Sequence, residues 1–456
     1  MLNITCENKT IRMSCGGRDF YPLSLDLLNI YGLDELLAHA ERVALIGDGI
    51  DFRVAGAIPD EAYGLYMELL RQVLYLHTTH CMYPRLSSKA PSRGADATED
   101  FEHYLNSLKN MPFFSDMCHC QILKNYCGGA PLVIVSPGPS LDVELLRRLK
   151  GRAYILAIGR TLPRLVAGGV VPDFLYIQDT SARAWRDIFV FDGCPDVLDT
   201  AVIANPAGYI HEYARKVRHI YKSWNYFLFE KDVMPKLGEI APSSTSGAFS
   251  LAMVLGAGEI VLMGNDCGGL GVRPATSIVD LDNVLRQGFL PKPVFAHLAQ
   301  YTLNTPRGLA WMTSDYLCAL QWLKTRIFAA AGRGGVRFYD NSATGFLRDT
   351  GLVAALPEDY ASPSHVNTPL PRYTISFHPE DYLKKHRGRF GMLRRCIRNG
   401  NPVLPVGLER PFNAVFCGIP QYAASGFVLD DRYNATVLDR IDRIIDQLDS
   451  NMAMEW

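Results

Sequence analysis

LVIVSPGPSL, residues 132–141, carries the clearest structural signal in the chain. Its first four residues are apolar with no polar alternation, which is typical of a strand buried on both faces of a parallel sheet. Pro137 and Gly138 then turn the chain. Leucines recur at helical spacing over residues 141–149, which predicts a helix directly after the turn. A buried strand, a turn and a helix in this order favour the α/β class.

The same alternation of strands and helices continues to about residue 356. Further strands are predicted at residues 154–158, 174–177, 201–204, 259–263 and 336–339, and longer helices at 246–255 and 315–331. This pattern favours a Rossmann-like, doubly wound and mostly parallel sheet. We therefore expect a central domain at 130–356 between an N-terminal α/β region at 1–129 and a C-terminal region at 357–456.

The two flanking regions carry weaker signals. In the first we expect a short strand at 43–46, a helix at 62–76 and a loop at 87–96. The second contains a basic segment, 384–398, which is either a solvated helix face or a surface for an acidic partner. It closes with an amphipathic helix, whose apolar stripe is Val437, Leu438, Ile441, Ile444, Ile445 and Leu448.

Length and charge exclude several classes of protein. The chain has 456 residues, 48% of them hydrophobic, which is enough for several buried cores. Lys plus Arg is 46 and Asp plus Glu is 47, so the basic excess typical of nucleic-acid-binding proteins is missing. The sequence contains no run of about 18 apolar residues for a transmembrane segment and no signal-peptide pattern at its start. We expect a cytoplasmic protein that does not bind nucleic acid.

The eleven cysteines are an odd number and are scattered along the chain, which argues against a disulfide scaffold. One group has residue types that bind zinc, but it lacks the paired C-x-x-C spacing that makes such a site specific. Buried or surface thiols remain the default interpretation, and no metal ligand is assigned. The group comprises His77, His80, Cys81, Cys118, His119, Cys120 and Cys127.

The turn after the first central strand is a candidate phosphate site. Gly138 would let the backbone approach a ligand closely, and Ser140 is placed to cap the following helix. The N–H groups and the dipole at a helix start favour negative charge. The alternative is an ordinary strand–helix turn with a serine cap, since the Rossmann G-x-G-x-x-G and the Walker lysine are both absent.

Other polar groups are expected at the same edge of the sheet. The sequence SSTSGA, 243–248, opens a helix with hydroxyl groups and a glycine. Asn265 and Asp266 follow the strand at 259–263, and Asp179 follows the strand at 174–177. Because the carboxyl ends of parallel strands meet at one edge, these side chains should lie near one ligand. Helix caps and turn aspartates are the alternatives.

Two aspartate patterns are weaker evidence for a functional site. Asp173 precedes a strand, which makes it a turn residue rather than a site residue. The Asp280-Leu281-Asp282 triplet has the D-x-D form that many glycosyltransferases use to hold a metal, but one match is expected by chance. Thr313 and Ser314 start a long helix and are interpreted as a cap.

The central block resembles the domain shared by Maf motility accessory factors, which are flagellin glycosyltransferases, and MptE-type 6-hydroxymethylpterin diphosphokinases. The order of motifs is also similar to a bacterial sialyltransferase family that uses CMP-sialic acid. The resemblance covers about residues 130–356. The chain departs from these patterns after Asp266, where Cys267-Gly268-Gly269 replaces the usual Leu or Phe and no tyrosine follows before Tyr301. The matching stretches are VIVSPGPSLD (133–142), ILAIGRTLPRLVAGGVVPDFLYIQD (155–179), TSGAFSLAMVLGAGEIVLMGND (245–266), MTSDYLCALQWLKTRI (312–327) and RFYDNSATGFL (337–347).

The resemblance implies a role for each matching residue. The nucleotide would be bound by Ser136, Gly138, Pro139, Ser140, Gly159, Arg160, Asp179, Thr245, Ser246, Gly247, Gly264 and Asn265. Within this set, residues 138–140 would hold the phosphate. Asp266 would lie beside the reacting sugar. His297 lies about thirty residues further on, which is similar to the spacing of the family's general-base histidine. The alternative base is Asp266. His297 can also be an ordinary core or surface histidine on a loop.

The expected function is therefore that of a nucleotide-sugar glycosyltransferase. It would transfer a nonulosonic, sialic-like acid from its CMP ester to a hydroxyl, such as a Ser or Thr of a flagellin-like protein acceptor. A divalent metal is compatible with the sequence but not required by it.

Two alternatives to this function stay open. One is diphosphate transfer from ATP to a pterin, with Mg²⁺ on Asp179 and Asp266, which the large flanking regions disfavour. The other is a non-catalytic nucleotide-binding assembly factor.

Overall fold

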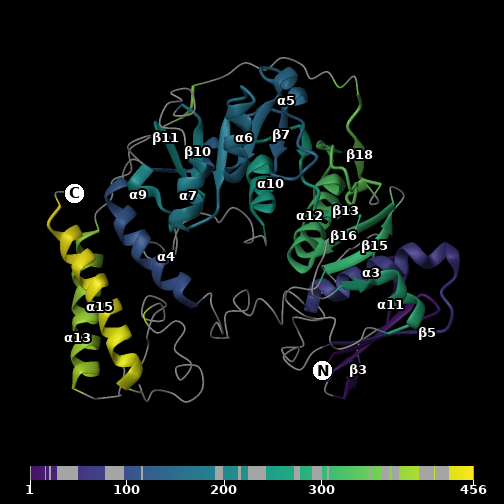
Figure 1. The fold of residues 1–456 in the computed structure, drawn as a ribbon, viewed down its shortest axis with the longest axis horizontal. Helices are drawn as coiled ribbons and strands as arrows, with labels where there is room; N and C mark the ends of the chain where they lie inside the picture. The colour runs from purple at the N-terminus through teal and green to yellow at the C-terminus, as the bar shows by residue number, and fades with distance from the viewer. Residues whose placement is uncertain are drawn as a thin grey trace.

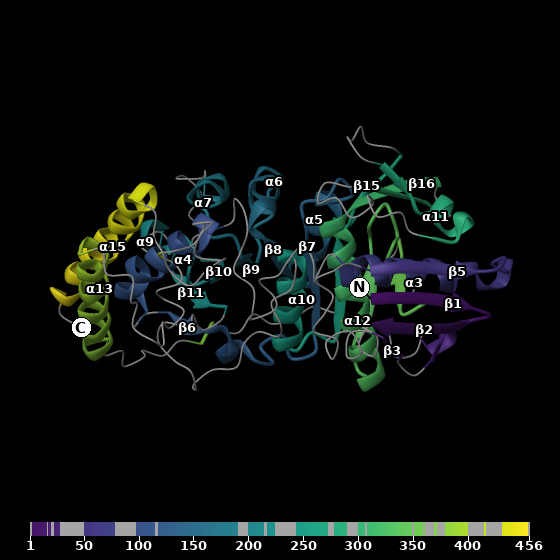
Figure 2. The same cartoon turned by 90° about the horizontal axis from the view of Figure 1, so that it is seen from below.

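The computed structural model describes most of the chain. The described residues are 2–15, 17–19, 22–27, 50–77, 97–114, 117–189, 199–213, 217–223, 243–271, 278–289, 300–305, 308–348, 351–358, 360, 369–371, 379–399, 415 and 431–454. A nine-stranded sheet forms the centre of the molecule, between a smaller N-terminal sheet at one end and a pair of helices at the other (Figures 1 and 2).

All neighbouring strands of the central sheet are parallel. Across the sheet the strands are β18 (Val353–Ala355), β17 (Arg337–Asp340), β12 (Glu259–Met263), β7 (Pro131–Val135), β8 (Tyr154–Ile158), β9 (Phe174–Ile177), β10 (Ala201–Ala204), β11 (His219–Lys222) and β6 (Cys118–His119). The first strand, β6, lies at one edge; from β7, near the middle, the chain then builds outward in both directions, as in a doubly wound fold.

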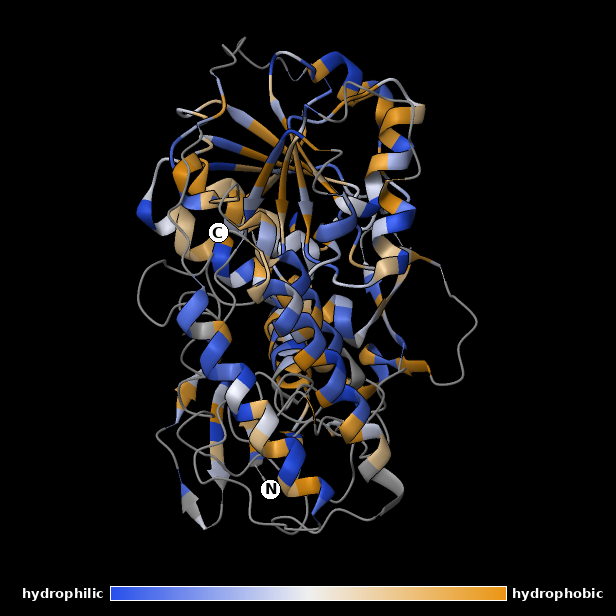
Figure 3. Ribbon diagram, turned by 90° about the vertical axis from the view of Figure 1, so that its left-hand side faces the viewer, coloured by the Kyte–Doolittle hydropathy of each residue, from blue (hydrophilic) through white to orange (hydrophobic). Residues whose placement is uncertain are grey.

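Two apolar cores cover the two faces of this sheet. Alternate residues of β7 point to opposite faces, so Leu132 and Ile134 join one core while Val133 and Val135 join the other. The first core includes α10 (Ser244–Val254) and α12 (Ser314–Arg333), and the second includes α5 (Val143–Leu149), α6 (Leu162–Ala167) and α7 (Ala182–Ile188). Figure 3 shows the apolar colour concentrated in the strands. The expected Rossmann-like α/β class is confirmed.

Two local predictions in this domain are wrong. Helix α5 begins at Val143 rather than at residue 141, because Asp142 is its N-cap and accepts a hydrogen bond from the Leu145 N–H at 2.9 Å. Ser140 therefore does not cap the helix. The sequence also predicts the strand at 336–339 to be the last of the sheet, but β18 follows it in the chain and pairs with its outer edge. The predicted cap at Thr313 is confirmed by its hydrogen bond from the Tyr316 N–H.

The N-terminal part forms its own sheet beside α3 (Tyr63–His77). Its strands are β1 (Leu2–Glu7), β2 (Thr10–Cys15), β3 (Arg18–Asp19), β4 (Leu23–Ser24) and β5 (Ile50–Ala55). Helix α3 is joined to α12 by a buried ionic group, in which Glu68 lies 2.7 Å from Arg71 and 3.3 Å from Lys324. Burial alone would raise the pKa of Glu68, but the two cations lower it to about 2. The strand and loop predicted at 43–46 and 87–96 lie outside the described residues.

A second small sheet is inserted between β12 and α12. It contains β13 (Gly269–Leu270), β14 (Ile278–Asp280), β15 (Gln300–Thr305) and β16 (Gly308–Thr313), with α11 (Leu281–Gln287). Both aspartates of the D-x-D triplet have structural partners here. Asp280 caps α11, and Asp282 accepts hydrogen bonds from the Tyr63 hydroxyl at 2.5 Å and from Asn304. The triplet is thus explained by folding.

The C-terminal part is a hairpin of α13 (Glu380–Arg398) and α15 (Asp431–Met452) that packs on α4 (Ala97–Asn110). The predicted amphipathic helix is confirmed, because five of its six stripe residues are buried and Leu438 packs against the same core. Several arginines of the basic segment pair with acids of α15: Arg387 with Asp449 at 2.9 Å, and Arg394 and Arg398 with Asp442. Part of this positive charge is therefore used inside the hairpin.

The described cysteines do not form a metal site. Cys118, Cys120 and Cys127 are buried thiols, whereas His80 and Cys81 lie outside the described residues. Within the described part of the chain, no group of three or more potential ligands is arranged to hold a metal ion. Among the described helices, none combines the length and apolar character needed to cross a bilayer.

Candidate functional site

A cavity of about 260 Å³ lies at the carboxyl ends of β12, β7, β8 and β9. It opens where the order of strands reverses, since β8 follows β7 on one side and β12 flanks β7 on the other. Ligands of open α/β sheets bind at this switch point. The loops after these four strands and the first turns of α10 and α12 form its wall.

Two glycines let the loops after β7 and β12 touch. The Gly138 N–H donates to the carbonyl of Gly264 at 2.9 Å. A Cβ on Gly138 would lie only 2.2 Å from that carbonyl oxygen. Gly264 has φ +67°, and its own Cβ would lie 2.3 Å from the Ser136 carbonyl oxygen. Contact between the two loops therefore requires glycine at both positions, whether or not a ligand is bound.

Asp266 joins three loops at the base of the cavity. One carboxylate oxygen accepts the Ser140 N–H at 3.0 Å, and the other accepts the Ala343 N–H at 2.8 Å. The Asp266 carbonyl accepts a hydrogen bond from the Thr344 hydroxyl at 2.6 Å. The side chain is only 3% exposed. These hydrogen bonds are those expected of a residue that positions the loops, because a general base would need a free carboxylate oxygen.

The residue after Asp266 is unusual in its backbone and unreactive in its side chain. Cys267 has φ +50°, a region that non-glycine residues rarely adopt and that costs free energy. This conformation turns the chain sharply at the end of β12. Burial raises the pKa of the Cys267 thiol to about 12, so the thiol stays protonated and is a poor nucleophile.

The start of α10 contributes hydroxyl groups to the cavity. Ser243 is the N-cap and accepts the Ser246 N–H at 3.2 Å. The Thr245 hydroxyl lies 3.0 Å from that of Ser136, which connects α10 to the end of β7. The N–H groups of Ser244 and Thr245 belong to the first helical turn, which has no intrahelical acceptor. Among the described residues neither has a hydrogen-bond partner, so both are available to an anion.

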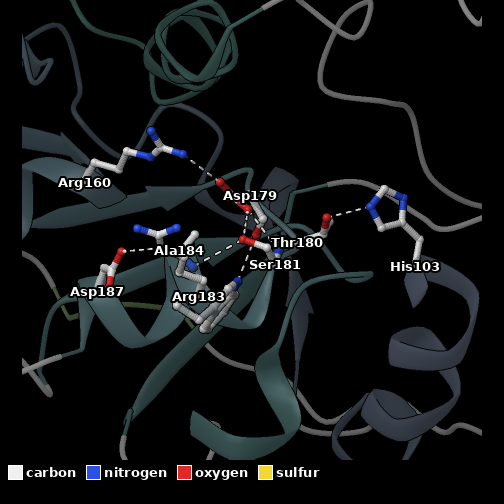
Figure 4. Close-up of polar contacts among 9 residues, drawn as sticks. His103, Arg160, Asp179, Thr180, Ser181, Arg183, Ala184 and Asp187 are labelled. Carbon is white, nitrogen blue, oxygen red and sulfur yellow. Dashed lines mark hydrogen bonds and ion pairs between the residues drawn. The ribbon is translucent and has the colours of Figure 1, made fainter. Parts of the chain in front are cut away.

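At the opposite end of the cavity, Asp179 holds the loop after β9 (Figure 4). One oxygen accepts Arg160 at 3.3 Å, and the other accepts both the N–H and the hydroxyl of Ser181 at 2.9 Å. The indole of Trp185 donates to the Asp179 carbonyl at 2.8 Å. The Arg160 guanidinium is mostly exposed, so it forms the rim of the cavity.

The structure gathers most of the predicted site residues and separates a few. Ser140, Ser246 and Gly247 do not line the cavity: Ser246 is fully buried, and a Cβ on Gly247 would collide with Tyr176. His297 lies outside the described residues. The predicted residues that line the cavity are Ser136, Gly138, Pro139, Gly159, Arg160, Asp179, Thr245, Gly264, Asn265 and Asp266.

Sequence reasoning missed several lining residues. Tyr316 lies in the first turn of α12, is 46% exposed and borders the cavity, although the sequence pattern there indicated only a helix cap. Tyr176 and Gln178 come from the strand and loop that also supply Asp179. The Gln178 Oε1 and Asn265 Nδ2 atoms are buried without a hydrogen-bond partner among the described residues. Such atoms in a cavity wall suit polar groups of a ligand.

Comparison with known proteins gives one family match. Residues 104–270 match the family described as 6-hydroxymethylpterin diphosphokinase MptE-like, which confirms the expected resemblance over that range. A solved structure titled "Structure of MAf glycosyltransferase from Magnetospirillum magneticum AMB-1" is similar at 14% identity and a TM-score of 0.43. The similarity spans 88% of this chain but only 63% of that one, which is less than two thirds of its length. No curated protein matches the chain.

Proposed function

We propose that the cavity binds a nucleotide-activated sugar and that the chain is a glycosyltransferase. One observation carries this proposal: the start of α10, which is rich in hydroxyl groups, lines a cavity at the switch point of the sheet. We further propose a CMP-linked nonulosonic acid as the donor and a hydroxyl, such as a protein Ser or Thr of a flagellin-like acceptor, as its target. These finer assignments rest on the order of sequence motifs.

The hydrogen bonds favour a different phosphate site from the one that the sequence suggests. In the turn at 137–140, the two prolines have no N–H, and those of Gly138 and Ser140 donate to Gly264 and Asp266. That turn therefore has no free backbone N–H, and the Ser140 hydroxyl, which is buried without a hydrogen-bond partner among the described residues, is its one remaining donor. The start of α10 instead offers the N–H groups of Ser244 and Thr245, a hydroxyl and the positive end of the helix dipole. We place the donor phosphate there.

A specific observation favours a second candidate, since the matching family is named for a diphosphokinase. Diphosphate transfer from ATP would need carboxylates for Mg²⁺, and Asp179 and Asp266 are the candidates. Both oxygens of Asp266 accept backbone N–H groups, while those of Asp179 accept Arg160 and Ser181. These two residues also follow strands separated by β7 and β8. This arrangement supports a donor with one phosphate over ATP–Mg²⁺.

Sugar transfer requires the acceptor hydroxyl to lose a proton as its oxygen bonds to the anomeric carbon and the phosphate departs. A base therefore has to reach that hydroxyl. Because both oxygens of Asp266 are engaged, we assign it to positioning the loops. The roles of His297 and Asp266 as bases stay predictions from the sequence.

Nucleotides should stabilise the fold selectively. We expect CMP at a hundredfold excess over its Kd to raise Tm by several degrees, because a ligand that binds only the folded state stabilises it by about 2.7 kcal/mol. The measurement is a thermal shift with CMP, CDP, AMP and ATP, with and without Mg²⁺. A response to ATP–Mg²⁺ alone would favour the diphosphokinase, and no response to any nucleotide would favour an assembly factor.

The Thr245→Val variant tests the phosphate site. We expect its affinity for CMP to fall about tenfold, because a hydrogen bond to a charged group contributes about 1.5 kcal/mol and valine keeps the shape of the side chain. Isothermal titration measures the change. Thr325→Val is the matched control, since Thr325 donates to the Gln321 carbonyl on α12 and does not line the cavity. Equal affinities in the two variants would remove Thr245 from the site.

A further inference from the structure

Helix α4 lies across the loops that follow β9 and β10. Asn110 donates to the carbonyls of Pro206 and Gly208, both at 2.8 Å, in the loop after β10. One turn earlier, Asn106 donates to the Ala207 carbonyl at 3.3 Å and lies 3.5 Å from that of Thr180, in the loop after β9. The polar face of α4 thus holds the backbone at this edge of the sheet.

His103 extends this contact to the candidate site. Its Nε2 lies 2.6 Å from the Thr180 hydroxyl, and Thr180 directly follows Asp179 (Figure 4). Asp179 in turn fixes Arg160 at the rim of the cavity. Figure 4 shows His103 and Arg160 on opposite sides of this loop. His103 is not a lining residue of the cavity. It therefore supports the loop from the side that faces away from the cavity.

The other side of α4 is held by the C-terminal hairpin. Residues of α4 share an apolar core with α13 and α15. Asn451 of α15 donates to the Leu108 carbonyl at 2.8 Å and is fully buried. Arg443 pairs with Glu102 at 3.1 Å and lies over the ring of Phe101. Glu102 and His103 are neighbours, so hairpin and cavity loop contact the same turn of one helix.

We propose that the α13–α15 hairpin fixes the Asp179 end of the cavity through α4, and that His103 is the positioning residue that joins them. The proposal rests on the proposed function in treating Asp179 as part of a binding site. It gives the C-terminal region a role in ligand binding although none of its described residues lines the cavity. Loss of the hairpin contact should then loosen the loop at 179–181.

Hydrogen exchange on the full chain tests this link without any nucleotide. Ser181 N–H donates to Asp179, and Ala184 N–H donates to Ser181, so a peptide covering 178–186 reports on the loop. In His103→Ala we expect this peptide to exchange about fivefold faster, the effect of one lost hydrogen bond. His103→Gln should restore slow exchange, because its amide can reach the same hydroxyl. Arg183→Ala is the control, since within the described part of the chain this exposed side chain has Asp187, at 4.0 Å, as its ion-pair partner.

A double-mutant cycle separates a specific link from general loosening. Thr180→Val should match His103→Ala, and the double variant should exchange no faster than either alone. Asn451→Ala should speed exchange in α4 and in 178–186 while peptides from β7 and β8 stay protected. Additive effects in the cycle, or Asn451→Ala acting on α4 alone, would overturn the proposal.

A parallel titration with CMP keeps the two hypotheses apart. If wild type binds CMP, His103→Ala should weaken binding and His103→Gln should restore it; wild-type affinity in His103→Ala would overturn the functional part of the proposal. If wild type binds no nucleotide, the proposed function fails, while the exchange cycle still decides whether His103 links α4 to the loop.

Discussion

Asp266→Asn is expected to lower the free energy of unfolding by about 2–4 kcal/mol and to abolish detectable nucleotide binding. In the native protein each carboxylate oxygen accepts one backbone N–H, from Ser140 and from Ala343. An asparagine has only one acceptor oxygen, so its NH₂ group would face one of these donors. At 3% exposure, water cannot easily replace the lost bond. The loops that form the cavity should then separate.

The measurement is chemical denaturation together with CMP titration. Asp142→Asn is the matched control, because Asp142 caps α5 at the surface and asparagine caps a helix about as well as aspartate. We expect that control to keep wild-type stability and affinity. If Asp266→Asn keeps the stability of wild type and loses only turnover, Asp266 is a catalytic base and our positioning role is wrong.

Gly138→Val is expected to destabilise the protein by about 3 kcal/mol and to weaken nucleotide binding as well. The added Cβ would lie 2.2 Å from the Gly264 carbonyl oxygen and 2.3 Å from the Asp266 carboxylate. Neither group can move without breaking the contact between the loops after β7 and β12. The side chain therefore forces these loops apart.

Thermal unfolding measures this effect, with Gly388→Ala as the control. Gly388 lies within α13 with no atom near the position of an added Cβ, so alanine should leave stability unchanged or raise it by up to about 1 kcal/mol. A Gly138→Val protein as stable as wild type, with weaker nucleotide binding alone, would mean that Gly138 is required for ligand approach rather than for loop packing.

The strands of the central sheet could be predicted because their apolar runs have no polar alternation. β12 was predicted at its exact bounds and β7 within one residue, since both are buried on both faces. The gathering of site residues at one edge of the sheet could also be predicted, because parallel strands bring their carboxyl ends together. This placed Asp179, Thr245 and Asp266 at one cavity although they are far apart in sequence.

The hydrogen bonds of the site could not be predicted, because they depend on partners distant in sequence. Asp266 meets Ala343, 77 residues later, through the neighbouring strand β17. The other oxygen of Asp266 accepts the N–H of Ser140, so this N–H, predicted to hold a phosphate, is already engaged. Likewise, His103 reaches Thr180 across 77 residues, and no local pattern marks either residue as part of the loop.

A crystal structure of the protein with CMP bound tests the central claim most directly. We predict the phosphate at the start of α10, within hydrogen-bonding distance of the N–H groups of Ser244 and Thr245, with Arg160 at the rim beside the ligand. The turn at 137–140 should keep its bonds to Gly264 and Asp266. A phosphate bound to that turn, or a nucleotide bound outside the cavity at the ends of β12, β7, β8 and β9, would contradict the account.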